Sequence, residues 1–153
     1  MSTPLAPNPL ENHLGYWLRF VSNQVSGGFR ERVAIRGATV AEWVVLRTLY
    51  HQTPLSLNDL IAATGADKGA SSRLVEQLVG KKLVSRTTAP GDRRGIALTL
   101  TAAGKSLVPK IARDADINDA AFFGSLSPRD QAHLRRILMA LVETNGLTAK
   151  PME

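Results

Sequence analysis

Basic side chains are concentrated in one part of this 153-residue sequence, and they are the groups best suited to act on a partner. Residues 67–105 hold eight Lys and Arg against three acids, a net charge of +5, whereas the whole chain carries +6. The basic residues of this segment are Lys68, Arg73, Lys81, Lys82, Arg86, Arg93, Arg94 and Lys105. Clustered positive charge predicts a polyanionic partner, and nucleic acid is the first candidate. The alternative is a solvated surface that only keeps the protein soluble.

The sequence gives little support for a metal site, a cysteine-based site or a catalytic pair of acids. The chain has no cysteine, which excludes disulfides, cysteine–zinc sites, iron–sulfur clusters and thiol nucleophiles. The three histidines, His13, His51 and His133, lack the spacing of a metal site. Asp114 and Asp116 are two residues apart, so on a helix they face different ways and are expected on a solvated face or in local balance of the helix dipole. We expect no enzyme activity, no metal and no cofactor.

Composition indicates a single globular domain over residues 1–153. Hydrophobic residues make up 44% of the chain and charged residues 21%, both ordinary values for a compact protein. No basic leader followed by an apolar segment opens the sequence, and no apolar run approaches 18 residues. We therefore expect a cytoplasmic protein with no membrane partner.

Helical periodicity and capping residues predict six helices. Asn8-Pro9 is typical of a helix start, and Gly27-Gly28 is expected to end that helix, followed by an irregular basic segment over 29–38. Thr39 with Glu42 indicates a capping box. Pro109 is expected to bend the fifth helix. The predicted helices cover residues 9–28, 40–50, 58–64, 68–81, 102–123 and 128–146.

One β-hairpin interrupts the helices. Residues 83–88 and 96–100 alternate with period two, and the turn-forming residues 89–95 separate them. The predicted fold is therefore mainly α with a small β-hairpin wing, a winged helix–turn–helix. Its DNA-binding part covers about 39–101, and helices from both ends of the chain, about 9–28 and 102–146, are left for dimerisation.

The predicted helix over 68–81 has the properties of a reading helix. In a helix–turn–helix, the first helix braces the second, whose N-terminal residues reach base edges in the major groove. Ser72 and Arg73 are the expected base readers, and Lys68 is expected on phosphate. The predicted DNA contacts on this helix are Lys68, Gly69, Ser71, Ser72 and Arg73. The alternative is a solvated helix face.

The hairpin offers a second DNA contact. Arg93 and Arg94 stand at its tip, and the negative potential of a narrow minor groove attracts arginine. Asp92 is expected to pair with a neighbouring arginine and to fix the loop, because phosphate would repel it. Arg86, on the first strand, completes the predicted contacts. The alternative is an ordinary exposed turn with an incidental ion pair.

Several motifs together resemble the MarR-type winged helix–turn–helix transcriptional regulators. They are Asp67-Lys68 with Ser72-Arg73-Leu74-Val75, then Lys81-Lys82-Leu83-Val84-Ser85-Arg86, then Gly91-Asp92-Arg93-Arg94, and last Leu98-Thr99-Leu100-Thr101-Ala102-Ala103-Gly104. The resemblance covers the whole chain in element order and residues 39–104 in motif detail. Gly69-Ala70-Ser71 departs from the Ser-Thr-Val-like triplet that is commoner in the family, which affects the base contact from position 70.

The resemblance implies a homodimer, built from the first, fifth and sixth helices, on a pseudo-palindromic operator in double-stranded DNA. It implies repression or, less often, activation. It also implies release by a small, often aromatic or anionic, effector or, in some members, by cysteine oxidation, and the absence of cysteine from this chain excludes the second route.

Dimerisation also follows from the residues. The first and last helices carry large apolar side chains, and a chain of this length has little other surface with which to cover them. They are Leu10, Leu14, Trp17, Val21, Leu134, Leu138 and Leu141. Pairing with a second copy would bury them, and most soluble oligomers are twofold. The alternative is that these stripes pack within one subunit.

A ligand crevice is expected between the dimerisation helices and the winged domain. His13, Trp17, Arg47 and His51 combine aromatic surfaces with cationic or polar groups, and they are the candidate ligand-binding residues. Each is also compatible with a purely structural position.

The sequence thus predicts a sequence-specific, dimeric, ligand-responsive transcriptional regulator. Two alternatives remain open at this point. One is a non-specific architectural DNA-binding protein, and the other is a protein-interaction adaptor on a winged-helix scaffold.

Overall fold

The computed structural model describes residues 7–89, 91–148 and 151, apart from the side chains of residues 92–94. Its described part contains six α-helices, one short 3-10 helix and a two-stranded antiparallel sheet, which confirms the predicted fold class. The elements are η1 (Leu10–Asn12), α1 (Leu14–Ile35), α2 (Val40–His51), α3 (Leu57–Thr64), α4 (Lys68–Gly80), β1 (Val84–Ala89), β2 (Asp92–Leu100), α5 (Ala102–Phe123) and α6 (Pro128–Thr144).

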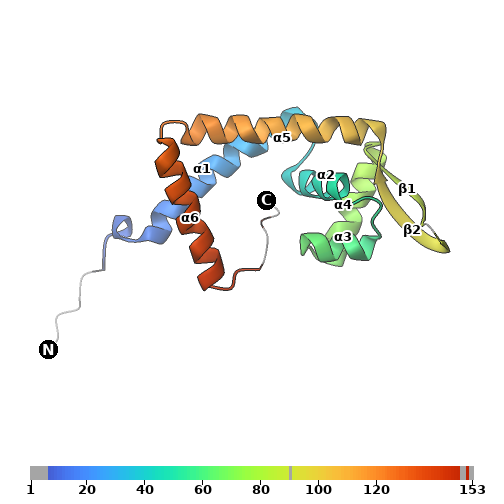
Figure 1. Ribbon diagram of the computed structural model, residues 1–153, viewed down its shortest axis with the longest axis horizontal. Helices are drawn as coiled ribbons and strands as arrows, with labels where there is room; N and C mark the ends of the chain where they lie inside the picture. The colour runs from blue at the N-terminus through green and yellow to red at the C-terminus, as the bar shows by residue number, and fades with distance from the viewer. Residues whose placement is uncertain (1–6, 90, 149–150, 152–153) are drawn as a thin grey trace.

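The molecule is elongated, with α5 connecting its two ends (Figure 1). The helices α2, α3 and α4 and the hairpin gather at one end, and α6 crosses the first part of α1 at the other. Figure 1 draws α5 as one continuous helix through Pro109. Among the residues that the structure describes, no helix combines the length and the apolar character needed to cross a membrane.

Side-chain caps start most of the helices where the sequence predicts them. The Thr39 hydroxyl accepts from the Glu42 backbone N–H, and the Glu42 carboxylate accepts from the Thr39 backbone N–H, a complete capping box. The side-chain caps of α3, α4, α5 and α6 are Ser56, Asp67, Thr101 and Ser127, the last followed by Pro128 in the first turn. Each cap satisfies a backbone donor that a helix start leaves unpaired.

The first helix differs from its predicted bounds. The helix α1 continues through Gly27 and Gly28 to Ile35, so the irregular segment expected over 29–38 is largely helical. Gly28 is a point of close approach: a Cβ built there would lie 2.6 Å from Oδ1 of Asn118 on α5. The start also differs, because Leu10–Asn12 form a 3-10 turn and Asn8 accepts from the Asn12 side chain instead of capping a helix.

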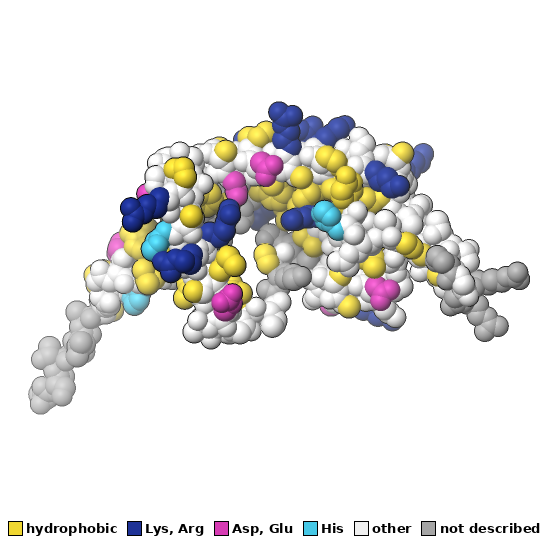
Figure 2. Space-filling view, viewed as in Figure 1, with side chains coloured by type: hydrophobic (Ala, Val, Ile, Leu, Met, Phe, Trp, Pro, Cys, Tyr) yellow, Lys and Arg dark blue, Asp and Glu magenta, His cyan; other side chains and the backbone are white. Residues whose placement is uncertain are grey.

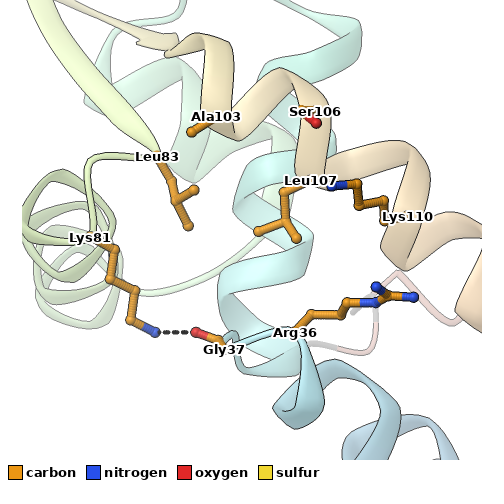
Figure 3. Close-up of a pocket in the computed structure, with 8 residues that line it drawn as sticks. All are labelled: Arg36, Gly37, Lys81, Leu83, Ala103, Ser106, Leu107 and Lys110. Atoms are coloured by element: carbon orange, nitrogen blue, oxygen red, sulfur yellow. Dashed lines mark hydrogen bonds between the residues drawn. The ribbon is translucent and has the colours of Figure 1, made fainter.

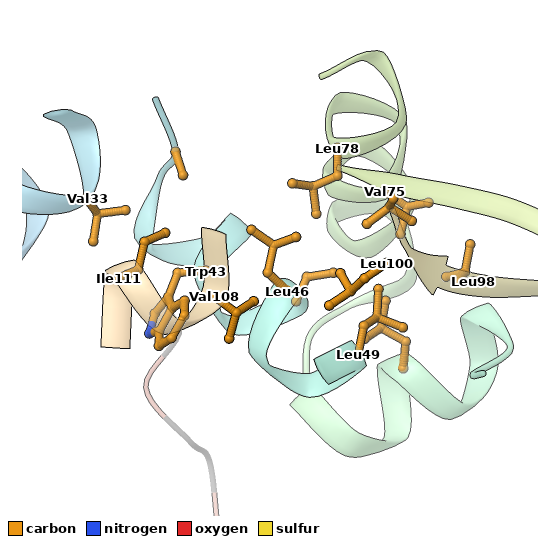
Figure 4. Close-up of a cluster of buried hydrophobic side chains, with 14 residues drawn as sticks. Val33, Trp43, Leu46, Leu49, Val75, Leu78, Leu98, Leu100, Val108 and Ile111 are labelled. Carbon is orange, nitrogen blue, oxygen red and sulfur yellow. The ribbon is translucent and has the colours of Figure 1, made fainter. Parts of the chain in front are cut away.

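The hydrophobic core lies between α2, α4, α5 and the hairpin (Figure 4). Leu46 and Leu49 of α2, Leu60 of α3 and Leu78 of α4 are fully buried there. The same cluster includes Val33 of α1 and Val108 and Ile111 of α5. Burying a large aliphatic side chain contributes about 1.5–3 kcal/mol each, so this shared core holds α4 and α5 in place through α2 and the hairpin.

The hairpin is anchored at its base and irregular near its tip. β1 pairs with β2 from Val84↔Leu100 to Thr88↔Ile96, and the register then shifts to Ala89↔Asp92. Residues 93–95 are therefore extra residues on β2, and the turn is shorter than the predicted 89–95 because β2 begins at Asp92. Leu55, in the loop before α3, exchanges backbone hydrogen bonds of 3.2 and 2.7 Å with Leu98, which holds the hairpin beside the helix–turn–helix.

Candidate nucleic-acid interface

The turn between α3 and α4 is built by three residues with distinct tasks. Gly65 ends α3 with φ of 73°, the left-handed conformation that suits glycine after a helix. The Thr64 hydroxyl is buried and donates to the Leu60 carbonyl at 2.8 Å. Asp67 then accepts from the Ala70 backbone N–H at 3.0 Å and starts α4. The predicted helix–turn–helix is thus present, with α3 bracing α4.

The start of α4 presents a mixed surface. Lys68, Gly69 and Arg73 are exposed, and Ser72 is half-buried. Ser71, which is predicted among the exposed contacts, is 2% exposed and lies on the same side of α4 as Val75 and Leu78. The spacing of 71, 75 and 78 is that of one helix face, so Ser71 packs inward and we withdraw it as a DNA contact.

Arg86 contacts the reading helix. Its guanidinium pairs with the Glu76 carboxylate of α4 on the protein surface. The two side chains lie over a hollow of about 180 Å³ between α4 and the hairpin, which Ser72 and Ile96 also line. An exposed pair contributes little stability, so its main consequence is to link β1 to α4.

The tip of the hairpin carries the remaining predicted contacts. The backbone of Asp92, Arg93 and Arg94 belongs to β2, at the end of the hairpin away from α5. Their side chains lie outside the described part of the structure, and so does the predicted pairing of Asp92 with an arginine. The irregular register at residues 93–95 turns this stretch of β2 away from regular pairing.

A buried carboxylate anchors the other end of α4. Glu42 is 1% exposed, and its Oε2 accepts from the Lys81 ammonium at 2.8 Å. Lys81 is the C-terminal cap residue of α4 and also donates to the Gly37 carbonyl at 2.9 Å. In the sequence, Lys81 is only one cation of the basic segment, whereas the structure gives it an internal partner.

A second long-range ion pair joins Arg36, at the end of α1, to Asp114 of α5. Arg36 donates from Nε to Oδ2 of Asp114 at 2.7 Å and from Nη2 to Oδ1 at 3.1 Å. The expectation of a solvated Asp114 is therefore wrong, because this carboxylate is 7% exposed. Its hydrogen bonds from Arg36 hold the pKa of Asp114 below the ordinary value against the opposing effect of burial, and the charges of Arg36, Arg32 and Arg113 add to the lowering.

The candidate ligand residues fall into two groups. Arg47 and His51 of α2 line a cavity of about 470 Å³ against α5, together with Phe29, Trp43, Tyr50, Val108, Pro109, Ala112, Ala115 and Asp116. His13 and Trp17 are not among its lining residues; they lie at the exposed start of α1, where the Trp17 indole donates to the Glu11 carbonyl at 2.8 Å. One chain alone therefore does not bring the four predicted residues together. Within the described ranges, no group of His, Asp or Glu has the arrangement of a metal site.

A bracing helix, a glycine turn, an exposed basic reading helix and an antiparallel hairpin define a winged helix–turn–helix protein. A family model described as the MarR family matches residues 36–95, which cover α2, α3, α4 and most of the hairpin. Over these residues the chain is similar to the MarR family, and this match supports a MarR-type winged helix–turn–helix regulator.

Individual relatives extend the similarity over nearly the whole chain. The transcriptional repressor NicR of Pseudomonas putida is 26% identical over 146 residues, which are 94% of this chain and 92% of NicR. Among solved structures, Bordetella bronchiseptica BpsR, whose DNA binding is regulated by 6-hydroxynicotinic acid, has a TM-score of 0.74 and 28% identity over 89% of this chain and 97% of its own. A variant of E. coli MarR with operator DNA, at 22% identity, shows the same fold with a TM-score of 0.73 over 84% of this chain and 93% of its own.

Proposed function

We propose that this protein is a sequence-specific DNA-binding repressor that acts as a homodimer and is released by a small-molecule effector. The observation that carries the proposal is the placement of α4, whose exposed basic start lies at the same end of the molecule as the hairpin. The repressor role is supported by the similarity to NicR, which is a transcriptional repressor.

The proposed DNA contacts follow from the exposed surface of α4 and from the hairpin. A helix about 10–12 Å wide fits the major groove, so α4 enters it with its first turns leading. Arg73 and the accessible part of Ser72 read bases there, and Lys68 binds phosphate beside Gly69. Arg93 and Arg94 enter the adjacent minor groove. Arg86, held by Glu76, lies between these two regions and contacts the backbone.

Apolar surface at the other end of the molecule supports the homodimer. No residue of α6 is buried, although Ile137, Leu138, Leu141 and Val142 lie on it. The turn η1 and the first part of α1 are similar: the exposed large side chains there are Leu10, Leu14, Trp17, Leu18, Phe20 and Val21. A soluble protein rarely leaves so much contiguous apolar surface uncovered. A second copy covers it by symmetry and sets two reading helices about one DNA turn, 34–36 Å, apart.

The effector is proposed to bind the cavity between α2 and α5. The Arg47 guanidinium and the His51 imidazole supply polar groups beside the buried Trp43, which suits a small aromatic acid. The relative BpsR responds to 6-hydroxynicotinic acid, a molecule of that class. His13 and Trp17 join this site only if the partner subunit's first helix carries them to it.

Selection of bound fragments from genomic DNA tests the proposal. The selected duplex should bind about 10³-fold or more tightly than random DNA at the same salt concentration. An architectural protein would bind both duplexes alike, and an interaction adaptor would bind neither at low salt. Either result would overturn the proposal. Sedimentation of the free protein tests the dimer in the same preparation.

A further inference from the structure

An open cleft lies on the side of α5 that faces away from the Arg47 cavity. It has a volume of about 510 Å³ and is lined by Arg36, Gly37, Lys81, Leu83, Ala103, Ser106, Leu107 and Lys110 (Figure 3). Ala103, Leu107 and Lys110 recur at the spacing of one face of α5. Val108, Ala112 and Ala115, which line the Arg47 cavity, occupy the opposite face. The two hollows are therefore separate sites.

The cleft combines an apolar floor with a cationic rim. Leu83 and Leu107 project into its centre in Figure 3, with Lys81 and Lys110 on either side of them and the Arg36 guanidinium at the outer edge, directed away from the two leucines. Arg36 and Lys81 keep 40% and 41% of their side-chain surfaces exposed although each has an ion-pair partner. This pattern suits a molecule with one apolar part and one charged part.

Hydrogen-bond donors remain on each cation. A guanidinium has five N–H groups, and Arg36 uses two of them on Asp114. An ammonium has three, and Lys81 uses two, on Glu42 and on the Gly37 carbonyl. Lys110 is exposed and has no ion-pair partner among the described residues. The rim can therefore still donate to an anion without breaking either existing pair.

The local charge also favours an anion. The charges of Arg32 and Arg113 help Arg36 to lower the pKa of Asp114, so the charges of three arginines act on this single carboxylate. The other carboxylate near the cleft, Glu42, is buried and paired with Lys81. Figure 2 shows Lys and Arg side chains gathered over α5. The positive charge around the cleft exceeds the negative charge that the chain itself provides.

We propose that this cleft binds a small organic carboxylate. Its carboxylate accepts from Lys110 and from the remaining donors of Arg36, and its apolar part lies on Leu83 and Leu107. The walls come from the α1–α2 turn, the end of α4 and the start of α5, so the ligand bridges the reading helix and α5. A resulting change in DNA affinity rests on the proposed function; the binding itself does not.

Benzoate is a suitable first probe because it combines a carboxylate with one apolar ring. With nine heavy atoms, it is expected to bind with a dissociation constant on the order of 1 mM. Titration of the isotope-labelled full chain, followed by backbone amide shifts in the absence of DNA, should move the amides of Leu83, Leu107 and Lys110. Benzyl alcohol, which lacks the charge, should not move them. Shifts confined to Arg47 and His51, equal shifts with benzyl alcohol, or no shift at about 20 mM benzoate would overturn the proposal.

Matched lysine variants separate a built site from general attraction. Lys110→Met should weaken benzoate binding about five- to tenfold through loss of a charge-assisted hydrogen bond. Lys105→Met removes the same charge from an exposed position on α5 that does not line the cleft, and it should leave the affinity nearly unchanged. Equal losses in the two variants would show only a diffuse electrostatic effect and would contradict the site. Because both are measured without DNA, a failure here is distinct from a failure of the proposed regulator.

Discussion

The Lys81 ammonium at the end of α4 lies 2.8 Å from the Glu42 carboxylate, which is almost completely buried at the start of α2. Glu42 also accepts from the Thr39 backbone N–H at 2.8 Å, so one carboxylate closes the α2 cap and holds the reading helix. A buried charge is costly unless it is paired and hydrogen-bonded, and Glu42 has both kinds of partner. The orientation of α4 therefore depends on an ion pair remote from the proposed base contacts.

Loss of one partner of this pair should destabilise the fold strongly. Lys81→Met is expected to lower the free energy of unfolding by on the order of 2–4 kcal/mol, because it leaves a buried carboxylate without its cation. Denaturant unfolding measures the change. Adding Glu42→Gln should recover much of the loss, since a neutral amide costs less to bury. A single Lys81→Met variant as stable as the original chain would show that the pair contributes little.

The pair between Arg36 and Asp114 predicts a pH dependence of stability. The folded-state pKa of Asp114 is lowered, so its contribution is complete above the unfolded value of about 3.9 and is lost as the pH falls through the folded pKa. Asp114→Asn should therefore be less stable than the original chain at pH 6, and the difference should shrink below about pH 4. Unfolding curves for both proteins across this range measure it. A difference that is constant with pH would contradict the proposed ionic contribution.

Two neighbouring glycines in α1 are expected to respond in opposite directions to alanine. A Cβ at Gly27 meets no atom within 4 Å, so Gly27→Ala should stabilise the chain by about 0.5–1 kcal/mol through helix propensity. A Cβ at Gly28 would lie 2.6 Å from Oδ1 of Asn118, whose amide donates to the Val25 carbonyl at 3.1 Å. Gly28→Ala should therefore cost about 1–2 kcal/mol. Thermal unfolding of the two variants side by side tests the contrast, and equal effects would contradict it.

Features that depend on neighbouring residues, such as helix caps, can be predicted from local sequence. The capping box of Thr39 and Glu42 depends on residues three positions apart, and the structure confirms it. The end of the first helix was predicted wrongly, because the reason for Gly28 lies on α5, 90 residues later in the chain. Periodicity carries no information about such a crossing.

The candidate site also combines features that local sequence predicts with features that depend on tertiary packing. The reading helix and its exposed Lys68 and Arg73 follow from charge and spacing, whereas the inward position of Ser71 depends on how α4 packs. The partners of Lys81 and Arg36 are 39 and 78 residues away, so no local pattern could pair them. Charge counts predicted a basic segment correctly but could not separate cations that face a partner from those that hold the fold.

A charged residue on the apolar face of α6 should prevent dimer formation. Leu138 is 39% exposed in the single chain, and the proposed dimer buries it. Leu138→Glu should shift the protein to monomer in sedimentation at micromolar concentration, because the interface would bury an unpaired charge. Ala140→Glu, which places the same charge at another exposed position of α6, should leave the dimer largely intact. A dimer that tolerates Leu138→Glu would show that α6 is not its interface.

Removing a base contact should weaken DNA binding without lowering the free energy of unfolding. Arg73 is exposed on α4, so Arg73→Ala should leave the unfolding free energy nearly unchanged while weakening binding to the selected operator by about 1–3 kcal/mol. Arg94→Ala should have an effect of similar size through the minor groove. Arg129→Ala removes another exposed arginine, from the start of α6 at the other end of the molecule, and provides the matched control. Titration of operator and random duplexes at one salt concentration distinguishes the roles. An Arg73 variant that loses affinity for both duplexes equally binds phosphate, one that loses it for the operator alone reads bases, and one that matches Arg129→Ala on both would remove Arg73 from the interface.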